Sequence, residues 1–132
     1  MQTVHDTLAL CCVDPTRVDP DVVAAHIALA QDRVAFGPVV GRDFLVAARS
    51  LTVALLHRQQ FNAMVATIRA PALIVQGERD RLVRVEAARA LAAARPDWLL
   101  RVLDDLGHVP QLEAPTRFLG VVEPWLRAHR SA

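Results

Sequence analysis

The clearest structural signal in the sequence is Ala72-Leu73-Ile74-Val75-Gln76-Gly77-Glu78-Arg79-Asp80. Its apolar residues run without alternation over 72–75, which is typical of a strand buried on both faces of a parallel sheet. A turn containing Gly77 follows the apolar run and ends at the carboxylate of Asp80. The stretch therefore predicts a buried strand that leads directly into an acid-bearing loop.

A second stretch of the same kind lies further along the chain. Residues 98–103 predict another strand, and the loop after it, Asp105-Leu106-Gly107-His108-Val109-Pro110, carries an imidazole. The alanine-rich residues 85–94 predict a helix between the two strands. A right-handed crossover of this kind brings the carboxyl ends of parallel strands to one edge of the sheet. We therefore expect Asp80 and His108 to meet there, although either residue taken singly is more often an ordinary polar residue of a loop.

The segments outside the two strands are helical by pattern. Asp19-Pro20 predicts a helix start, with Asp as N-cap and Pro at the first helical position. Gly37-Pro38 predicts the end of that helix, and residues 1–18 show no clear pattern beyond a turn at Asp14-Pro15. Further helices are expected over about 41–57, over about 59–68, and from about 114 onward with a kink at Pro124.

Composition bounds the class of protein. The chain has 132 residues, 53% of them hydrophobic and 22% charged, as expected for one globular domain or a piece of one. Basic and acidic side chains balance to a net charge of +1 without a basic block, which argues against nucleic-acid binding. All 15 basic residues are arginine, and the absence of lysine excludes Schiff-base chemistry and lysine-based phosphate loops.

The cysteines and the N-terminal residues indicate in which cellular compartment the protein is expected. Cys11 and Cys12 are adjacent, so a disulfide between them would be strained, and the sequence has no other cysteine. No signal-peptide pattern and no apolar run of membrane-spanning length is present. We expect a cytoplasmic protein that engages neither membranes nor nucleic acid. Metal ligands at matched spacing are lacking, so neither a metal nor an organic cofactor is expected.

Residues 69–128 resemble the C-terminal part of the α/β-hydrolase family, in which nucleophile, acid and histidine follow in that order. Residues 70–83 resemble the family's acid-bearing strand and loop, and residues 107–118 resemble its histidine loop and final helix. The resemblance implies that Asp80 is the acid of a catalytic triad and that His108 is its general base. It implies hydrolysis of an ester or a related bond.

The same resemblance implies a domain organisation. The fold class is α/β, a partial α/β-hydrolase fold. Residues 1–68 form a helical lid-like segment, and residues 69–132 form the strand–helix–strand–helix part of the core with parallel strands. Apolar faces of the lid would line a pocket for a small hydrophobic ester-like substrate.

Other polar residues are weaker candidates for the site. Glu78 is expected to be a solvated turn residue, and Glu113 is expected to assist the start of the last helix. His26 and His57 are expected at the surface or in the lid. Cys11 lacks the elbow or helix start that would activate a thiol nucleophile.

The nucleophile is the part that the sequence does not provide. Its only serines are Ser50 and Ser131, and neither lies in a Gly-x-Ser-x-Gly setting. An Asp nucleophile would need the same strained elbow. We therefore expect a fragment that is inactive alone. A competing hypothesis is a non-catalytic module whose exposed strand edge pairs with a second copy or with a chain supplying the missing half.

Overall fold

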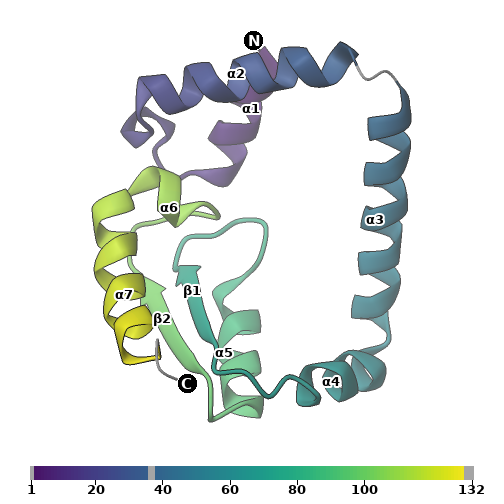
Figure 1. Ribbon diagram of the computed structural model, residues 1–132, viewed down its shortest axis with the longest axis vertical. Helices are drawn as coiled ribbons and strands as arrows, with labels where there is room; N and C mark the ends of the chain where they lie inside the picture. The colour runs from purple at the N-terminus through teal and green to yellow at the C-terminus, as the bar shows by residue number, and fades with distance from the viewer. Residues whose placement is uncertain (1, 36–37, 130–132) are drawn as a thin grey trace. The chain divides into compact units, whose positions relative to one another are not determined.

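A computed structural model describes residues 2–35 and 38–129 and contains two compact units (Figure 1). The core unit comprises the described parts of Met1–Ala25 and Pro71–Ala132. The helical unit comprises the described parts of His26–Ala70. Helix α2 (Pro20–Ala35) begins in the core unit and ends in the helical unit.

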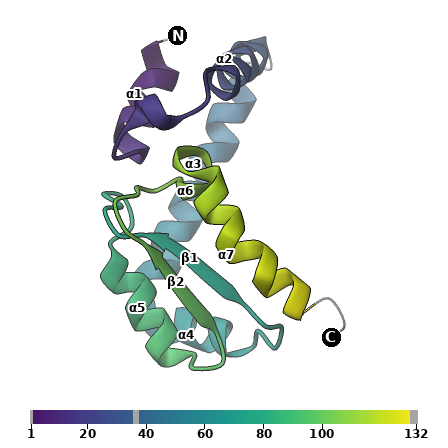
Figure 2. The same cartoon turned by 90° about the vertical axis from the view of Figure 1, so that its left-hand side faces the viewer.

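The centre of the core unit is a strand–helix–strand crossover. Strands β1 (Leu73–Gly77) and β2 (Leu99–Leu103) pair in parallel, with Leu73 opposite Leu99 and Gly77 opposite Leu103. Helix α5 (Val85–Ala94) connects them, so the expected strand–helix–strand order and the parallel pairing are confirmed. Figures 1 and 2 show the sheet between α5 on one face and α7 (Pro115–Ala128) on the other.

The burial of the first strand differs from the expectation. Residues 73–76 are half-buried rather than buried, and among the described residues the sheet contains two strands. Because β1 has a neighbouring strand along one edge only, its apolar side chains are covered incompletely. The continuous apolar run correctly identified a parallel strand but overestimated how much of it this chain covers.

The N-terminal segment forms a helix that the sequence did not reveal. Helix α1 (Gln2–Cys11) is followed by a 3₁₀ turn, η1 (Pro15–Arg17). Leu8, Cys12 and Val18 are buried together, and Val109 and Leu112 from the other end of the chain pack against them. The expected turn at Asp14 is confirmed, since its carboxylate accepts the backbone N–H of Thr16 at 3.0 Å. This packing makes α1 part of the core unit.

Polar and proline signals predicted the starts of α2 and of the last helix correctly. Helix α2 begins at Pro20, and the Asp19 carboxylate accepts the N–H of Asp21 at 2.8 Å, as expected of an N-cap. The last helical stretch is divided into α6 (Pro110–Glu113) and α7, and Pro124 lies inside α7. The expected helix end at Gly37 lies outside the described residues.

The helical unit contains the end of α2, α3 (Pro38–Leu56) and α4 (Arg58–Ala66). Both expected helices are present, with α3 beginning about one turn earlier than expected. Several large apolar side chains of α3 are exposed, among them Phe44, Leu45 and Leu51. In the described parts of the chain, no helix combines the length and apolar character needed to cross a membrane.

Candidate active site

Asp80 and His108 meet beyond the carboxyl ends of the two strands. The His108 Nδ1 atom lies 2.8 Å from Oδ2 of Asp80. The Asp80 side chain is 3% exposed, whereas the His108 side chain is 37% exposed. The crossover thus brings the two residues predicted from sequence into direct contact, with the acid enclosed and the imidazole open to the outside.

The carboxylate of Asp80 is surrounded by donors. Oδ1 accepts the backbone N–H groups of Leu82 and Val83 at 2.8 and 2.9 Å, and Oδ2 accepts Nε2 of Gln76 at 2.8 Å in addition to His108. Burial alone would raise the pKa of Asp80. The bonds from Val83, His108, Leu82 and Gln76 outweigh burial and hold the pKa below its ordinary value. Asp80 is therefore ionised at neutral pH.

An ionised carboxylate can only accept hydrogen bonds, which settles the tautomer of a neutral His108. The proton resides on Nδ1, where it is donated to Asp80, and the lone pair of Nε2 is left to take up a proton. This is the arrangement that a general base requires. Asp80 therefore orients the ring of His108 through Nδ1, and Nε2 is the nitrogen without the proton.

Two glycines allow the loops of the site to approach closely. A Cβ at Gly77 would collide with the carbonyl oxygens of Leu106 and Gly107. A Cβ at Gly107 would collide with the carbonyl oxygen of Cys11. The end of β1, the histidine loop and the end of α1 are therefore stacked backbone against backbone. Glycine is required at both positions by the lack of space.

Glu113 occupies a different place from the one expected. No side chain caps the start of α7, and Glu113 is buried at 3% exposure. Its carboxylate accepts the backbone N–H of Gly107 at 2.8 Å and that of Asp14 at 2.8 Å. Glu113 does not cap the last helix by a hydrogen bond, because the backbone N–H groups of Gly107 and Asp14 take up its oxygens.

Gln76 and Arg81 support the site and were not singled out from the sequence. Gln76 donates to Val83 O at 3.1 Å as well as to Asp80, which ties the strand to the acid loop. Arg81 donates to the carbonyls of Ala9 and Cys12 at 3.1 and 2.7 Å. Gln76 could have been identified from the sequence, because it is a polar residue at the end of an apolar strand. No sequence signal identified Arg81, because its partners lie on α1 and in the turn after it.

The remaining candidates lie elsewhere. Ser50 is an exposed residue of α3, Ser131 lies outside the described residues, and Glu78 is exposed as expected. His26 and His57 are exposed residues of the helical unit. Burial, and then the Asp80 carboxylate, raises the pKa of the Cys11 thiol, which disfavours the thiolate form. Residues 2–35 and 38–129 hold no group of three or more His, Cys, Asp or Glu side chains suited to a metal ion.

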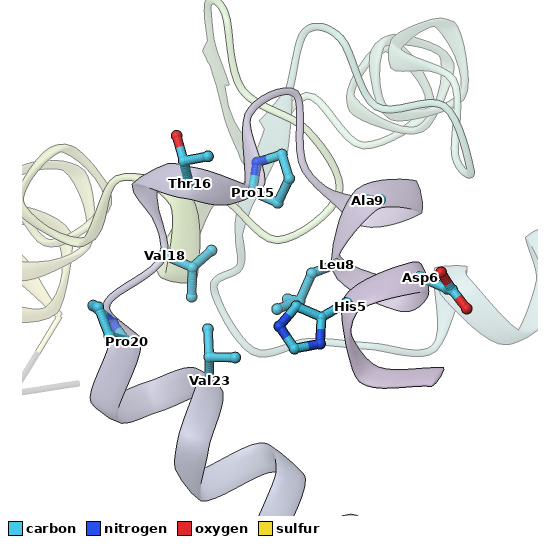
Figure 3. Close-up of a pocket in the computed structure, with 9 residues that line it drawn as sticks. All are labelled: His5, Asp6, Leu8, Ala9, Pro15, Thr16, Val18, Pro20 and Val23. Atoms are coloured by element: carbon cyan, nitrogen blue, oxygen red, sulfur yellow. The ribbon is translucent and has the colours of Figure 1, made fainter. Parts of the chain in front are cut away.

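A cavity of about 570 Å³ lies between α1, η1 and the first turn of α2 (Figure 3). Leu8, Val18 and Val23 face one another across it, and His5 lies at its border. Its described lining residues come from the N-terminal segment, and none belongs to the loops of Asp80 or His108. The cavity is therefore a feature separate from the acid–histidine pair.

Parallel strands that present an acid and then a histidine at one edge match the C-terminal part of the α/β-hydrolase fold. The model of the alpha/beta hydrolase family matches residues 5–121, and the chain belongs to that family. No curated protein matches the chain.

Two solved structures show the same fold. A protein of Acinetobacter baumannii AYE, whose description proposes a lipase, aligns with 97% of this chain at a TM-score of 0.73 and 22% identity. An alpha/beta hydrolase enzyme from the sediment metagenome of the Mar Chica lagoon, Morocco, aligns with 73% of this chain at a TM-score of 0.55 and 22% sequence identity. This chain spans 42% and 43% of their respective lengths, so the described fold is a partial α/β-hydrolase fold.

Proposed function

We propose that this chain supplies the acid and the general base of a hydrolase acting on an ester or a related bond. The observation that carries the proposal is the 2.8 Å contact between His108 Nδ1 and an enclosed, ionised Asp80, with the imidazole partly exposed. Family membership supports the reaction class. Asp80 and His108 are the residues to which we assign the chemistry.

In the proposed reaction, Nε2 of His108 removes the proton of a nucleophilic hydroxyl as that oxygen attacks the substrate carbonyl. The ring is then an imidazolium, which the Asp80 carboxylate stabilises through the Nδ1 hydrogen bond. The same imidazolium returns its proton to the leaving group, so His108 acts first as base and then as acid. Asp80 stays ionised throughout.

We propose that the nucleophile comes from outside these 132 residues, on the same longer polypeptide or on a separate chain. Ser50 lies within the regular helix α3, where the strained turn of a nucleophile elbow is not available. Triad members depend strongly on one another, and each oxyanion-hole donor contributes roughly 10²–10³ in rate. The 132-residue chain alone is therefore inactive, and the helical unit acts as a lid over a hydrophobic substrate only in the completed enzyme.

The purified chain tests this proposal directly. We expect no ester hydrolysis above background and no labelling by a serine-directed fluorophosphonate. Labelling that disappears in Ser50→Ala would contradict the assignment of the nucleophile to another segment.

The genomic DNA beside the coding sequence provides the positive test. We expect an in-frame or adjacent segment encoding Gly-x-Ser-x-Gly. Its product together with this chain should lose activity in Asp80→Asn and His108→Ala.

The backbone of β1 favours a second candidate function, that of a module which associates through a strand edge. Ala72 O accepts from Leu99, and Glu78 N–H donates to Leu103 O, so residues 72, 74, 76 and 78 face β2. By alternation, Leu73 and Val75 turn their backbone groups to the opposite edge. No described strand pairs there. Such an edge is suited to a strand from a second copy or from a chain supplying the missing half.

A further inference from the structure

The buried carboxylate of Glu113 is not accounted for by the chemistry of Asp80 and His108. Its side chain is fully enclosed, at 0% exposure. A buried charge is strongly unfavourable unless hydrogen bonds or an ion pair compensate it. The groups that surround this carboxylate therefore indicate what its burial accomplishes.

Two backbone donors from distant parts of the chain compensate the charge. Oε1 accepts the N–H of Asp14, which lies 99 residues away in sequence, and Oε2 accepts the N–H of Gly107; both distances are 2.8 Å. The guanidinium of Arg17 adds an ion pair, with Nη1 3.8 Å from Oε1. One side chain thus joins the loop after α1 to the residue immediately before His108.

A second contact acts on the next peptide group. The backbone N–H of His108 donates to the carbonyl oxygen of Cys11 at 2.6 Å. Gly107 itself lies so close to Cys11 that a Cβ would not fit. The backbone of Gly107 and His108 is therefore held by Glu113 and by the end of α1. The ring of His108 can rotate only about its side-chain bonds.

We propose that Glu113 is a positioning residue for the acid–histidine pair. By fixing Gly107 against the loop of Asp14, its carboxylate keeps the His108 backbone where Nδ1 reaches Asp80. The role as a positioning residue rests on the proposed function of the pair. The effect of Glu113 on the position of His108 does not rest on that function, because the hydrogen bond between His108 and Asp80 is present without a nucleophile or substrate.

The test is the variant Glu113→Gln in the 132-residue chain. An amide offers one acceptor oxygen, so one of the two backbone N–H groups loses its partner. We expect the Nδ1 proton resonance of His108, observed by NMR, to broaden or disappear. Exchange of the Gly107 or the Asp14 amide, whichever N–H loses its partner, is expected to accelerate at least about tenfold, because a hydrogen bond to a charged acceptor is lost. Asp80→Asn gives the reference spectrum of an uncoupled ring.

Glu123→Gln is the matched control, because Glu123 is an exposed residue of α7 and the same charge is removed. Its His108 signal is expected to match that of the unchanged protein. If Glu113→Gln does not fold, Glu113→Asp keeps the charge with a shorter reach and carries the same measurement. Loss of folding in both variants, or a folded variant with an unaltered His108 signal, would show a purely structural role and overturn the proposal. Absence of ester hydrolysis from this chain combined with the segment encoding Gly-x-Ser-x-Gly would bear on the proposed function alone.

Discussion

The Asp80 carboxylate makes four hydrogen bonds that depend on its negative charge, and this gives folding a defined pH dependence. Its pKa is lowered in the folded protein, where the bonds from Val83, His108, Leu82 and Gln76 outweigh the opposing effect of burial. A group of this kind stabilises the fold above its unfolded pKa of about 3.9 and loses that contribution as pH falls through the lower folded value.

Asp80→Asn is therefore expected to destabilise the chain by about 2 kcal/mol near neutral pH, since bonds to a charged acceptor are replaced. The difference between variant and unchanged protein is expected to shrink once the pH is below the ordinary carboxyl range. Urea unfolding of both proteins, near neutral pH and below the carboxyl range, measures this difference in the free energy of unfolding. A difference independent of pH would contradict the ionised state assigned to Asp80.

The close approach of backbones at Gly77 and Gly107 predicts a sharp contrast among glycines. Gly77→Ala and Gly107→Ala are each expected to lower the free energy of unfolding by about 1–3 kcal/mol or more, because the new methyl group meets backbone atoms that cannot move aside. Gly120→Ala, in α7 with nothing within 4 Å of the new Cβ, is expected to stabilise by up to about 1 kcal/mol. Chemical denaturation of the three variants checks this. Equal effects at all three sites would rule out the stacked arrangement of the loops.

Among the elements, the C-terminal end of α1 accepts hydrogen bonds from the two loops that carry Asp80 and His108. Arg81, which follows Asp80 in sequence, donates to the carbonyls of Ala9 and Cys12, and His108 N–H donates to that of Cys11. Carbonyls at a helix C-terminus lack partners within the helix. Both loops of the site thus bind the same helix end.

Arg81→Met is expected to loosen α1 more than the rest of the core unit. Loss of the guanidinium leaves the Ala9 and Cys12 carbonyls without this donor, at a cost of about 1–3 kcal/mol. Hydrogen exchange is expected to show faster exchange in α1 while β2 is little affected. Arg89→Met, at an exposed position of α5, removes the same charge and serves as control. Equal protection of α1 in both variants would count against the role given to Arg81.

The elements that could be predicted from sequence are those whose signals are local. The apolar run of β1, the alanines of α5 and the Asp19-Pro20 pair each carry their signal within a few residues, and the corresponding elements are present. The meeting of Asp80 and His108 followed from topology. The place of Glu113 could not be predicted, because its partners are backbone N–H groups, one of which, that of Asp14, lies 99 residues away in sequence. The packing of α1 likewise depends on Val109 and Leu112.

For the molecule as a whole, the second edge of β1 has a measurable consequence. Self-association through this edge is expected to appear as a rise of sedimentation coefficient with concentration. Val75→Pro removes an N–H directed to the open edge while leaving the bonds to β2 intact, and it is expected to weaken association. Val75→Ala shortens the side chain but keeps the N–H, and its association is expected to persist. A chain that remains monomeric at all concentrations would contradict edge pairing.

The core unit is made from two stretches of sequence, with the helical unit inserted between them. The hydrogen bonds that hold the histidine loop therefore span up to 99 residues. Closing so long a loop costs entropy that grows only with the logarithm of its length, about 0.6 kcal/mol for each doubling. The inserted helices can accordingly lengthen, shorten or change sequence over evolution with little effect on the acid–histidine geometry. The helical unit can therefore vary in length and sequence, while the core unit keeps the contact between Asp80 and His108.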